Sequence, residues 1–121
     1  MCYIHNCERR ALKSNDRGAD KWIRLIDECL DAGLLFALLT GGEPMLHPGF
    51  DSVYTRLREN GIITTVNTNA YLITDERLAL FGRLPPQRFN ISLYGVNDSG
   101  YEYLTGAKNG FTVVEWGGCL A

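Results

Sequence analysis

The sequence predicts an α/β fold in which parallel strands alternate with helices. Three runs rich in apolar or β-branched residues, at 34–40, 62–69 and 88–95, are each expected to form a strand. Each run follows a stretch whose apolar residues recur at helical spacing. Strands that are separated by helices pair in parallel through right-handed crossovers, so we expect a sheet or a partial parallel (β/α) barrel with about three βα units.

Three amphipathic helices are expected, over residues 18–33, 47–61 and 74–84. The first should end at Gly33, and the second should end at the Asn60-Gly61 pair, since glycine is common just past a helix. Thr74 is the expected N-cap of the third helix, with acidic residues in the first turn. The apolar face of the second helix is predicted to consist of Phe50, Val53, Tyr54 and Leu57.

The first strand, "LLFALLT" at residues 34–40, is apolar without alternation. This pattern is typical of a strand that is buried on both faces. Directly after it comes "GGEP", and the second strand ends in "NTNA" at residues 67–70. The third strand contains Ser92 near its end. Ligands bind at the carboxyl ends of parallel strands, so these three strand ends form the predicted site.

The residue types at this site are suited to a small zwitterion. Gly41 and Gly42 allow a ligand to lie against the main chain. Glu43 is suited to an ammonium group, and Pro44 stiffens the turn by fixing its φ angle. Two weaker candidates, Asn69 and Ser92, can donate hydrogen bonds to carboxylate or hydroxyl oxygens.

Composition narrows the class of protein. A chain of 121 residues is expected to be one domain or part of one, and its net charge of -2 gives no indication of nucleic acid or an anionic membrane as partner. No apolar run reaches the roughly 18 residues of a membrane span, and no signal peptide is evident. We therefore expect a cytoplasmic protein whose 4 cysteines are free thiols or metal ligands rather than disulfides.

The spacing of the cysteines matches no complete metal-binding motif within the sequence. Cys29 falls on the apolar face of the first predicted helix and is expected in the core. A zinc site at Cys2, His5 and Cys7 is an alternative, but no fourth ligand follows at customary spacing.

Three stretches resemble the radical SAM superfamily. "LLTGGEPMLHPGF" resembles its second-strand motif, in which Gly-Gly-Glu-Pro holds the amino group of S-adenosylmethionine. "VNTNAYL" resembles its third-strand stretch, usually Thr-Asn-Gly, with Ala70 in place of the glycine. "FNISLYGVNDSGYEYLTGAKNGF" is similar to its fourth strand and following helix, especially in peptide-modifying members with a cysteine-rich C-terminal domain. The resemblance runs from about residue 2 to residue 111.

The resemblance implies two cofactors, a [4Fe–4S] cluster and S-adenosylmethionine, together with a reductant protein that supplies an electron. It implies that residues 41–44 bind the amino group, and that Asn69 and Ser92 bind the ribose or carboxylate. The substrate would be a peptide or a small molecule. Cys2, which Tyr3 follows, resembles the third cysteine of the CxxxCxxC cluster motif, whose first two cysteines would precede Met1.

On this basis residues 1–121 are expected to be an incomplete radical SAM core domain, which lacks the first strand and the late βα units. Two alternatives stay open. One is a truncated, non-catalytic module that binds S-adenosylmethionine or a partner chain. The other is an unrelated α/β enzyme whose strand ends converge on a similar pattern.

Overall fold

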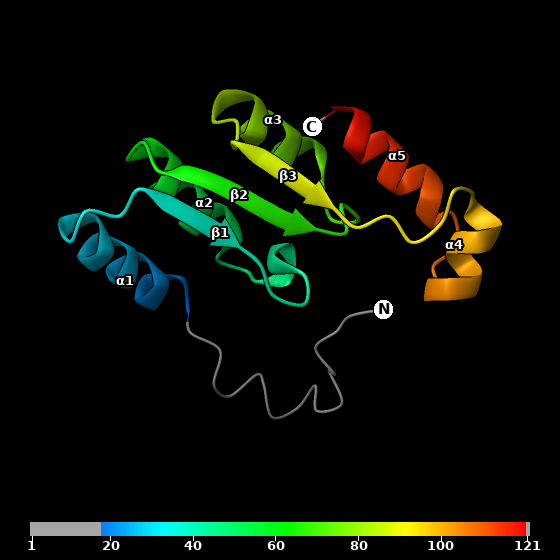
Figure 1. The fold of residues 1–121 in the computed structure, drawn as a ribbon, viewed down its shortest axis with the longest axis horizontal. Coiled ribbons are helices and arrows are strands. Elements are labelled where there is room, and N and C mark those ends of the chain that lie inside the picture. Colours follow the sequence, from blue (N-terminus) through cyan, green and yellow to red (C-terminus); the bar gives the residue numbers. More distant parts are fainter. Residues whose placement is uncertain (1–17, 121) are drawn as a thin grey trace.

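The computed structural model describes residues 18–120 and contains a three-stranded parallel sheet with helices between the strands (Figure 1). The strands are β1 (Phe36–Leu39), β2 (Ile63–Thr68) and β3 (Arg88–Ile91), in the order β1-β2-β3. The helices are α1 (Ala19–Asp31), α2 (Phe50–Glu59), α3 (Asp75–Arg83), α4 (Asp98–Thr105) and α5 (Gly110–Leu120), with a short 3-10 helix, η2 (Pro44–Leu46).

The parallel pairing that the sequence predicts is confirmed. Phe36 lies opposite Ile63 at the amino ends of β1 and β2, and Asn67 lies opposite Asn90 near the carboxyl ends of β2 and β3. The predicted N-cap of the third helix is confirmed, because Thr74 Oγ1 accepts a hydrogen bond from the Arg77 nitrogen. The first two helices end shortly before Gly33 and Gly61, as predicted, whereas the second begins at Phe50 and not at residue 47. With all strands parallel, the three loops of the predicted site meet at one edge of the sheet.

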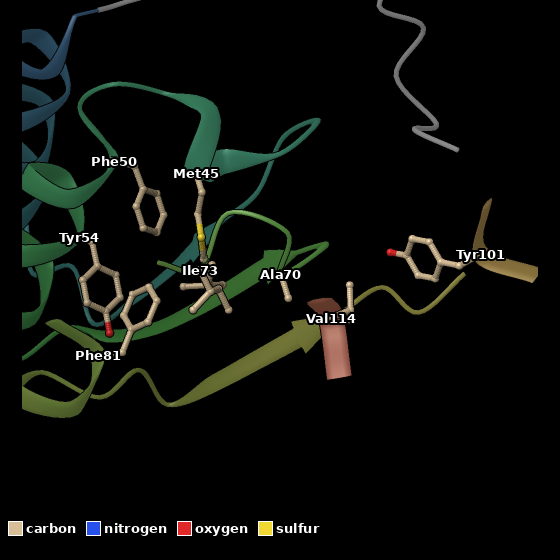
Figure 2. Packing of buried hydrophobic residues seen from close by; sticks show 9 residues of the cluster. Met45, Phe50, Tyr54, Ala70, Ile73, Phe81, Tyr101 and Val114 are labelled. Atoms are coloured by element: carbon tan, nitrogen blue, oxygen red, sulfur yellow. The ribbon is translucent and has the colours of Figure 1, made fainter. Parts of the chain in front are cut away.

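The main core lies between the sheet and the helices α2 and α3, which cover one face of the sheet in Figure 1. Figure 2 shows Phe50, Tyr54 and Phe81 packed together in this core. The Tyr54 ring stacks on Phe50 with centroids 5.9 Å apart and meets Phe81 edge-on at 5.1 Å. All four residues predicted for the apolar face of the second helix are buried: Phe50, Val53, Tyr54 and Leu57.

The prediction that the first strand is buried on both faces is wrong. Phe36 is 66% exposed and Leu38 is 55% exposed, whereas Ala37 and Leu39 are half-buried against the helix side. In the part of the chain that the structure describes, α1, α2 and α3 pack on one side of the sheet, so alternate residues of β1 point away from them. We call the uncovered side the open face; it carries Phe36, Leu38, Ile63, Asn67 and Asn90.

The segment after β3 extends the fold beyond the carboxyl ends of the strands, where α4 and α5 lie in Figure 1. Tyr101 of α4 is buried and belongs to the same core cluster as Val114 of α5. Gly95 permits this packing, because a Cβ atom there would lie 2.8 Å from the Tyr101 nitrogen. Within residues 18–120, no helix has the length and apolar character needed to cross a membrane.

Candidate binding site at the carboxyl ends of the strands

A cavity of about 550 Å³ opens at the carboxyl ends of the three strands. Its volume lies within the range of roughly 300–1,000 Å³ that small-molecule sites occupy. The structure brings five of the predicted site residues to its wall: Gly41, Gly42, Glu43, Asn69 and Ser92. Pro44 does not line the cavity; it is the first residue of η2, where proline is favoured because its φ angle already suits a helix.

The loop after β1 exposes its main chain to the cavity. A Cβ atom built on Gly41 would meet no atom within 4 Å, so a ligand can approach the backbone there. Glu43 then ends the loop as the N-cap of η2, and its Oε1 accepts a hydrogen bond from the Met45 nitrogen at 3.1 Å. Because Met45 is buried in the core, this cap fixes the loop to the body of the domain.

The Glu43 carboxylate also joins the end of β1 to the end of β2. Its Oε1 accepts a hydrogen bond from Thr68 Oγ1 at 2.8 Å, and its Oε2 accepts one from the Asn69 nitrogen at 2.8 Å. An ionised carboxylate offers about four acceptor positions. Three of these are filled by the protein, and the fourth lies on Oε2. The carboxylate therefore keeps one acceptor position for a cationic donor.

The loop after β2 is a tight turn held by side chains. Thr68 Oγ1 accepts a hydrogen bond from the Ala70 nitrogen at 3.0 Å, and Asn69 Oδ1 accepts one from the Tyr71 nitrogen at 2.9 Å. Ala70 has a φ angle of 60°, in the left-handed region that favours glycine. The Asn69 side-chain nitrogen is not used in this turn, so it can donate to a ligand at the cavity wall.

The third strand end completes the wall. The Ser92 nitrogen donates to the Thr68 carbonyl at 3.0 Å, which continues the pairing of β3 with β2 beyond Ile91. The Ser92 residue is exposed and lines the cavity. A hydroxyl at this position is able both to donate and to accept.

Sequence reasoning missed several lining residues. Asn90 Nδ2 donates to Asn67 Oδ1 at 2.8 Å across the open face, and Thr68 holds Glu43. The alternation of strand residues between faces was the available signal, because it places Asn67 on the open face and Thr68 on the covered one. No sequence signal indicated the contact between Thr68 and Glu43, which depends on the pairing of β1 with β2.

Aromatic side chains form the side of the cavity nearest α4. The rings of Tyr94 and Tyr101 meet edge-on with centroids 5.9 Å apart, and both line the cavity together with Tyr71. Burial raises the pKa of Tyr101 above its ordinary value, and the neighbouring Tyr94 and Tyr71 raise it further. The hydroxyl of Tyr101 is therefore neutral at physiological pH.

The described residues do not test the predicted cluster ligand. Cys2 lies outside residues 18–120, as do His5 and Cys7. Cys29, which the sequence places in the core, is a half-buried free thiol on α1. Among the described residues, no group of three or more histidine, cysteine or acidic side chains is arranged to hold a metal ion. This part of the chain does not supply the thiolate set that an iron–sulfur cluster requires.

Comparison with known protein sequences identifies the family. Residues 2–115 match the model of the "Radical SAM superfamily". The chain is 34% identical over 102 residues to a dTDP-4-amino-4,6-dideoxy-D-glucose ammonia-lyase of Streptomyces venezuelae; the aligned region covers 79% of this chain and 20% of that enzyme. It is 27% identical over 99 residues to a PqqA peptide cyclase of Ruegeria pomeroyi, which covers 82% of this chain and 26% of the relative. The chain thus spans about a fifth to a quarter of these relatives.

Solved structures show the same fold. Streptococcus suis SuiB bound to the precursor peptide SuiA superposes with a TM-score of 0.69 at 23% identity, over 88% of this chain and 25% of SuiB. SuiB bound to S-adenosylmethionine gives a TM-score of 0.68 at the same identity and coverage. The three parallel strands therefore correspond to part of a larger, barrel-like α/β fold. The match over residues 2–115 shows that the chain belongs to the radical SAM superfamily.

Proposed function

We propose that the cavity at the carboxyl ends of β1, β2 and β3 binds S-adenosylmethionine. The observation that carries this proposal is the Glu43 carboxylate, which is fixed by three hydrogen bonds and has an acceptor position left on Oε2. The ammonium group of the ligand would donate to Oε2. Main-chain carbonyls of Gly41 and Gly42 would accept its remaining hydrogens, because the backbone there is open to a ligand.

The ends of β2 and β3 supply donors for the rest of the ligand. Asn69 and Ser92 line the same cavity and would bind the ribose hydroxyls or the carboxylate. A zwitterion that places its ammonium at Glu43 and its oxygens at these side chains meets opposite charge at one end and neutral donors at the other. This arrangement selects an amino-acid moiety over a simple nucleoside.

We further propose that Cys2 is a ligand of a [4Fe–4S] cluster. When reduced, such a cluster supplies the electron that cleaves the sulfonium of S-adenosylmethionine. The residues described here bind and orient the cofactor, and we assign them no part in the electron transfer. A separate reductant protein is expected to supply that electron.

A peptide is the substrate class that we propose for the whole protein. Two observations support it: the chain is similar to PqqA peptide cyclases, and it shares its fold with a SuiB structure that holds a precursor peptide. The ammonia-lyase relative, whose name indicates a nucleotide sugar, keeps a small-molecule substrate as the second candidate. A chain that binds S-adenosylmethionine but never assembles a cluster would instead be a non-catalytic binding module.

The proposal is tested by calorimetric titration of the chain with S-adenosylmethionine. Glu43→Gln removes the charge at the free acceptor position and should weaken binding at least about tenfold, since a charge-assisted hydrogen bond contributes about 1.5–3 kcal/mol. The matched control is Glu59→Gln, at the exposed end of α2, which should bind as the unmodified chain does. Equal affinities for all three proteins would contradict the assignment of Glu43.

A further inference from the structure

Thr68 lies at the centre of the strand ends and contacts all three of them. Its residue is 4% exposed, and it is the last residue of β2. Its Oγ1 donates to Glu43 after β1, and its carbonyl accepts from the Ser92 nitrogen after β3. The same Oγ1 accepts from the Ala70 nitrogen in the turn that follows β2. Both hydrogen-bonding functions of the hydroxyl are therefore satisfied inside the protein.

The direction of these bonds fixes the hydroxyl proton. Because Oγ1 accepts from a main-chain N–H, its own hydrogen is left to point at Glu43 Oε1, 2.8 Å away. Oε1 also accepts from the Met45 nitrogen, so this oxygen is fully occupied. The remaining acceptor position is thereby confined to Oε2, on the other side of the carboxylate.

A glutamate side chain without these partners rotates among several conformers, and a ligand that binds it must first order it. Two main-chain donors hold the Glu43 carboxylate: the Met45 nitrogen binds Oε1 from within the same loop, and the Asn69 nitrogen binds Oε2. The Thr68 hydroxyl adds a side-chain contact that ties Oε1 to β2. The three contacts together set the position and the plane of the carboxylate.

We propose that Thr68 is a positioning residue for cofactor binding, which acts through Glu43 rather than by touching the ligand. This inference rests on the proposed function of the cavity. It assigns a role to a residue that lines the cavity only with its few exposed atoms. Its hydroxyl keeps the Glu43 carboxylate in the orientation that presents Oε2 to an ammonium group.

The test compares Thr68→Val with Thr68→Ser by titration with S-adenosylmethionine. Valine keeps the shape and removes the hydroxyl, so binding should weaken about tenfold or more; serine keeps the hydroxyl and should stay within about threefold of the unmodified chain. In a Glu43→Gln background, Thr68→Val should cause little further loss, because the residue through which it acts is already changed. Equal losses for valine and serine, or additive losses in the double variant, would overturn the proposal.

A second measurement needs neither a ligand nor a variant. In the unmodified chain, the Thr68 hydroxyl proton should exchange slowly enough with water to give its own NMR signal, and the Asn69 amide proton should be protected. A hydroxyl that exchanges as fast as that of an exposed threonine would overturn the proposal. If the unmodified chain fails to bind S-adenosylmethionine while both protons are protected, the proposed function fails and the positioning of Glu43 by Thr68 stands.

Discussion

Replacement of Tyr54 by phenylalanine removes one hydroxyl from the core and so tests the contribution of its hydrogen bond to stability. Tyr54 has 0% exposure, and its hydroxyl donates to the Leu84 carbonyl at 2.5 Å. This bond ties α2 to the residue that ends α3. The ring contacts with Phe50 and Phe81 survive the substitution, because phenylalanine keeps the ring and its two aromatic neighbours (Figure 2).

The expected loss of stability comes from the Leu84 carbonyl, which loses its hydrogen-bond donor. A buried carbonyl that loses its donor costs about 1–3 kcal/mol, whereas the ring itself still contributes its full buried area. We therefore expect Tyr54→Phe to lower the free energy of unfolding by about 1.5 kcal/mol. Tyr54→Ala would also open a cavity and should cost about 3–5 kcal/mol.

Urea denaturation followed by far-ultraviolet circular dichroism measures the difference. With a urea dependence of about 1.5 kcal/mol per M, Tyr54→Phe should lower the midpoint by about 1 M and leave the slope unchanged. Tyr103→Phe is the control, since Tyr103 is 88% exposed on α4 and should not shift the midpoint. An unchanged midpoint for Tyr54→Phe would refute the argument that this hydrogen bond stabilises the packing of α2 on α3.

Three other predictions concern pH and backbone conformation. Burial raises the pKa of Tyr54 from 10.0 to about 12, against the opposing effect of Arg58, so the free energy of unfolding should fall as the pH rises from 10 to 12. Tyr54→Phe should reduce this dependence in alkaline titrations and leave the contribution of Tyr101, whose pKa is also raised. Hydrogen bonds from Thr112 lower the pKa of Asp98 below 3.8. Their contribution to stability is therefore present above that pH and is lost as the pH falls further. Asp98→Ala should speed amide exchange in α4 and α5 at pH 6 and should abolish that acid sensitivity. Ala70→Val should lower the melting temperature, since a β-branched residue is a steric outlier at a φ angle of 60° and its two added methyl groups would overpack a buried site, at a cost of about 1–3 kcal/mol. Ala70→Gly should change stability by less than about 1 kcal/mol, because relief of the left-handed strain offsets the lost methyl contact. An Ala70→Val protein that melts with the unmodified chain would contradict this.

Local patterns in the sequence predicted the elements well, because each depends on residues close to one another along the chain. The buried face of α2 follows from helical spacing, and the cap of α3 follows from the preference of threonine for that position. The gathering of Gly41, Glu43 and Asn69 at one cavity follows from the parallel order of the strands.

Features that depend on pairing between segments could not be predicted in the same way. The apolar run in β1 looked buried on both faces, but its burial depends on what packs against each face, and Phe36 and Leu38 lie on the open one. The sequence indicated Glu43 as a free carboxylate for an ammonium group. Two of its three internal hydrogen bonds arise because Thr68 and Asn69 lie at the end of the adjacent strand, a relation that no local pattern records.

The open face is apolar over β1 and the start of β2 and polar at the carboxyl ends of β2 and β3, and this difference bears on where water binds beside the cavity. Phe36 and Ile63 pair at the amino ends, while Asn67 and Asn90 pair at the carboxyl ends. Ordered water needs two to four polar partners, which the paired amides of Asn67 and Asn90 offer and the side chains of Phe36 and Ile63 do not. Ordered water should therefore be held at the rim near Asn67 and should be sparse over Phe36 and Leu38 of β1, whereas Thr65 and Arg88 provide polar groups on the same face of β2 and β3. A molecule that docks from the rim would displace the water bound there and would meet the apolar side chains of β1.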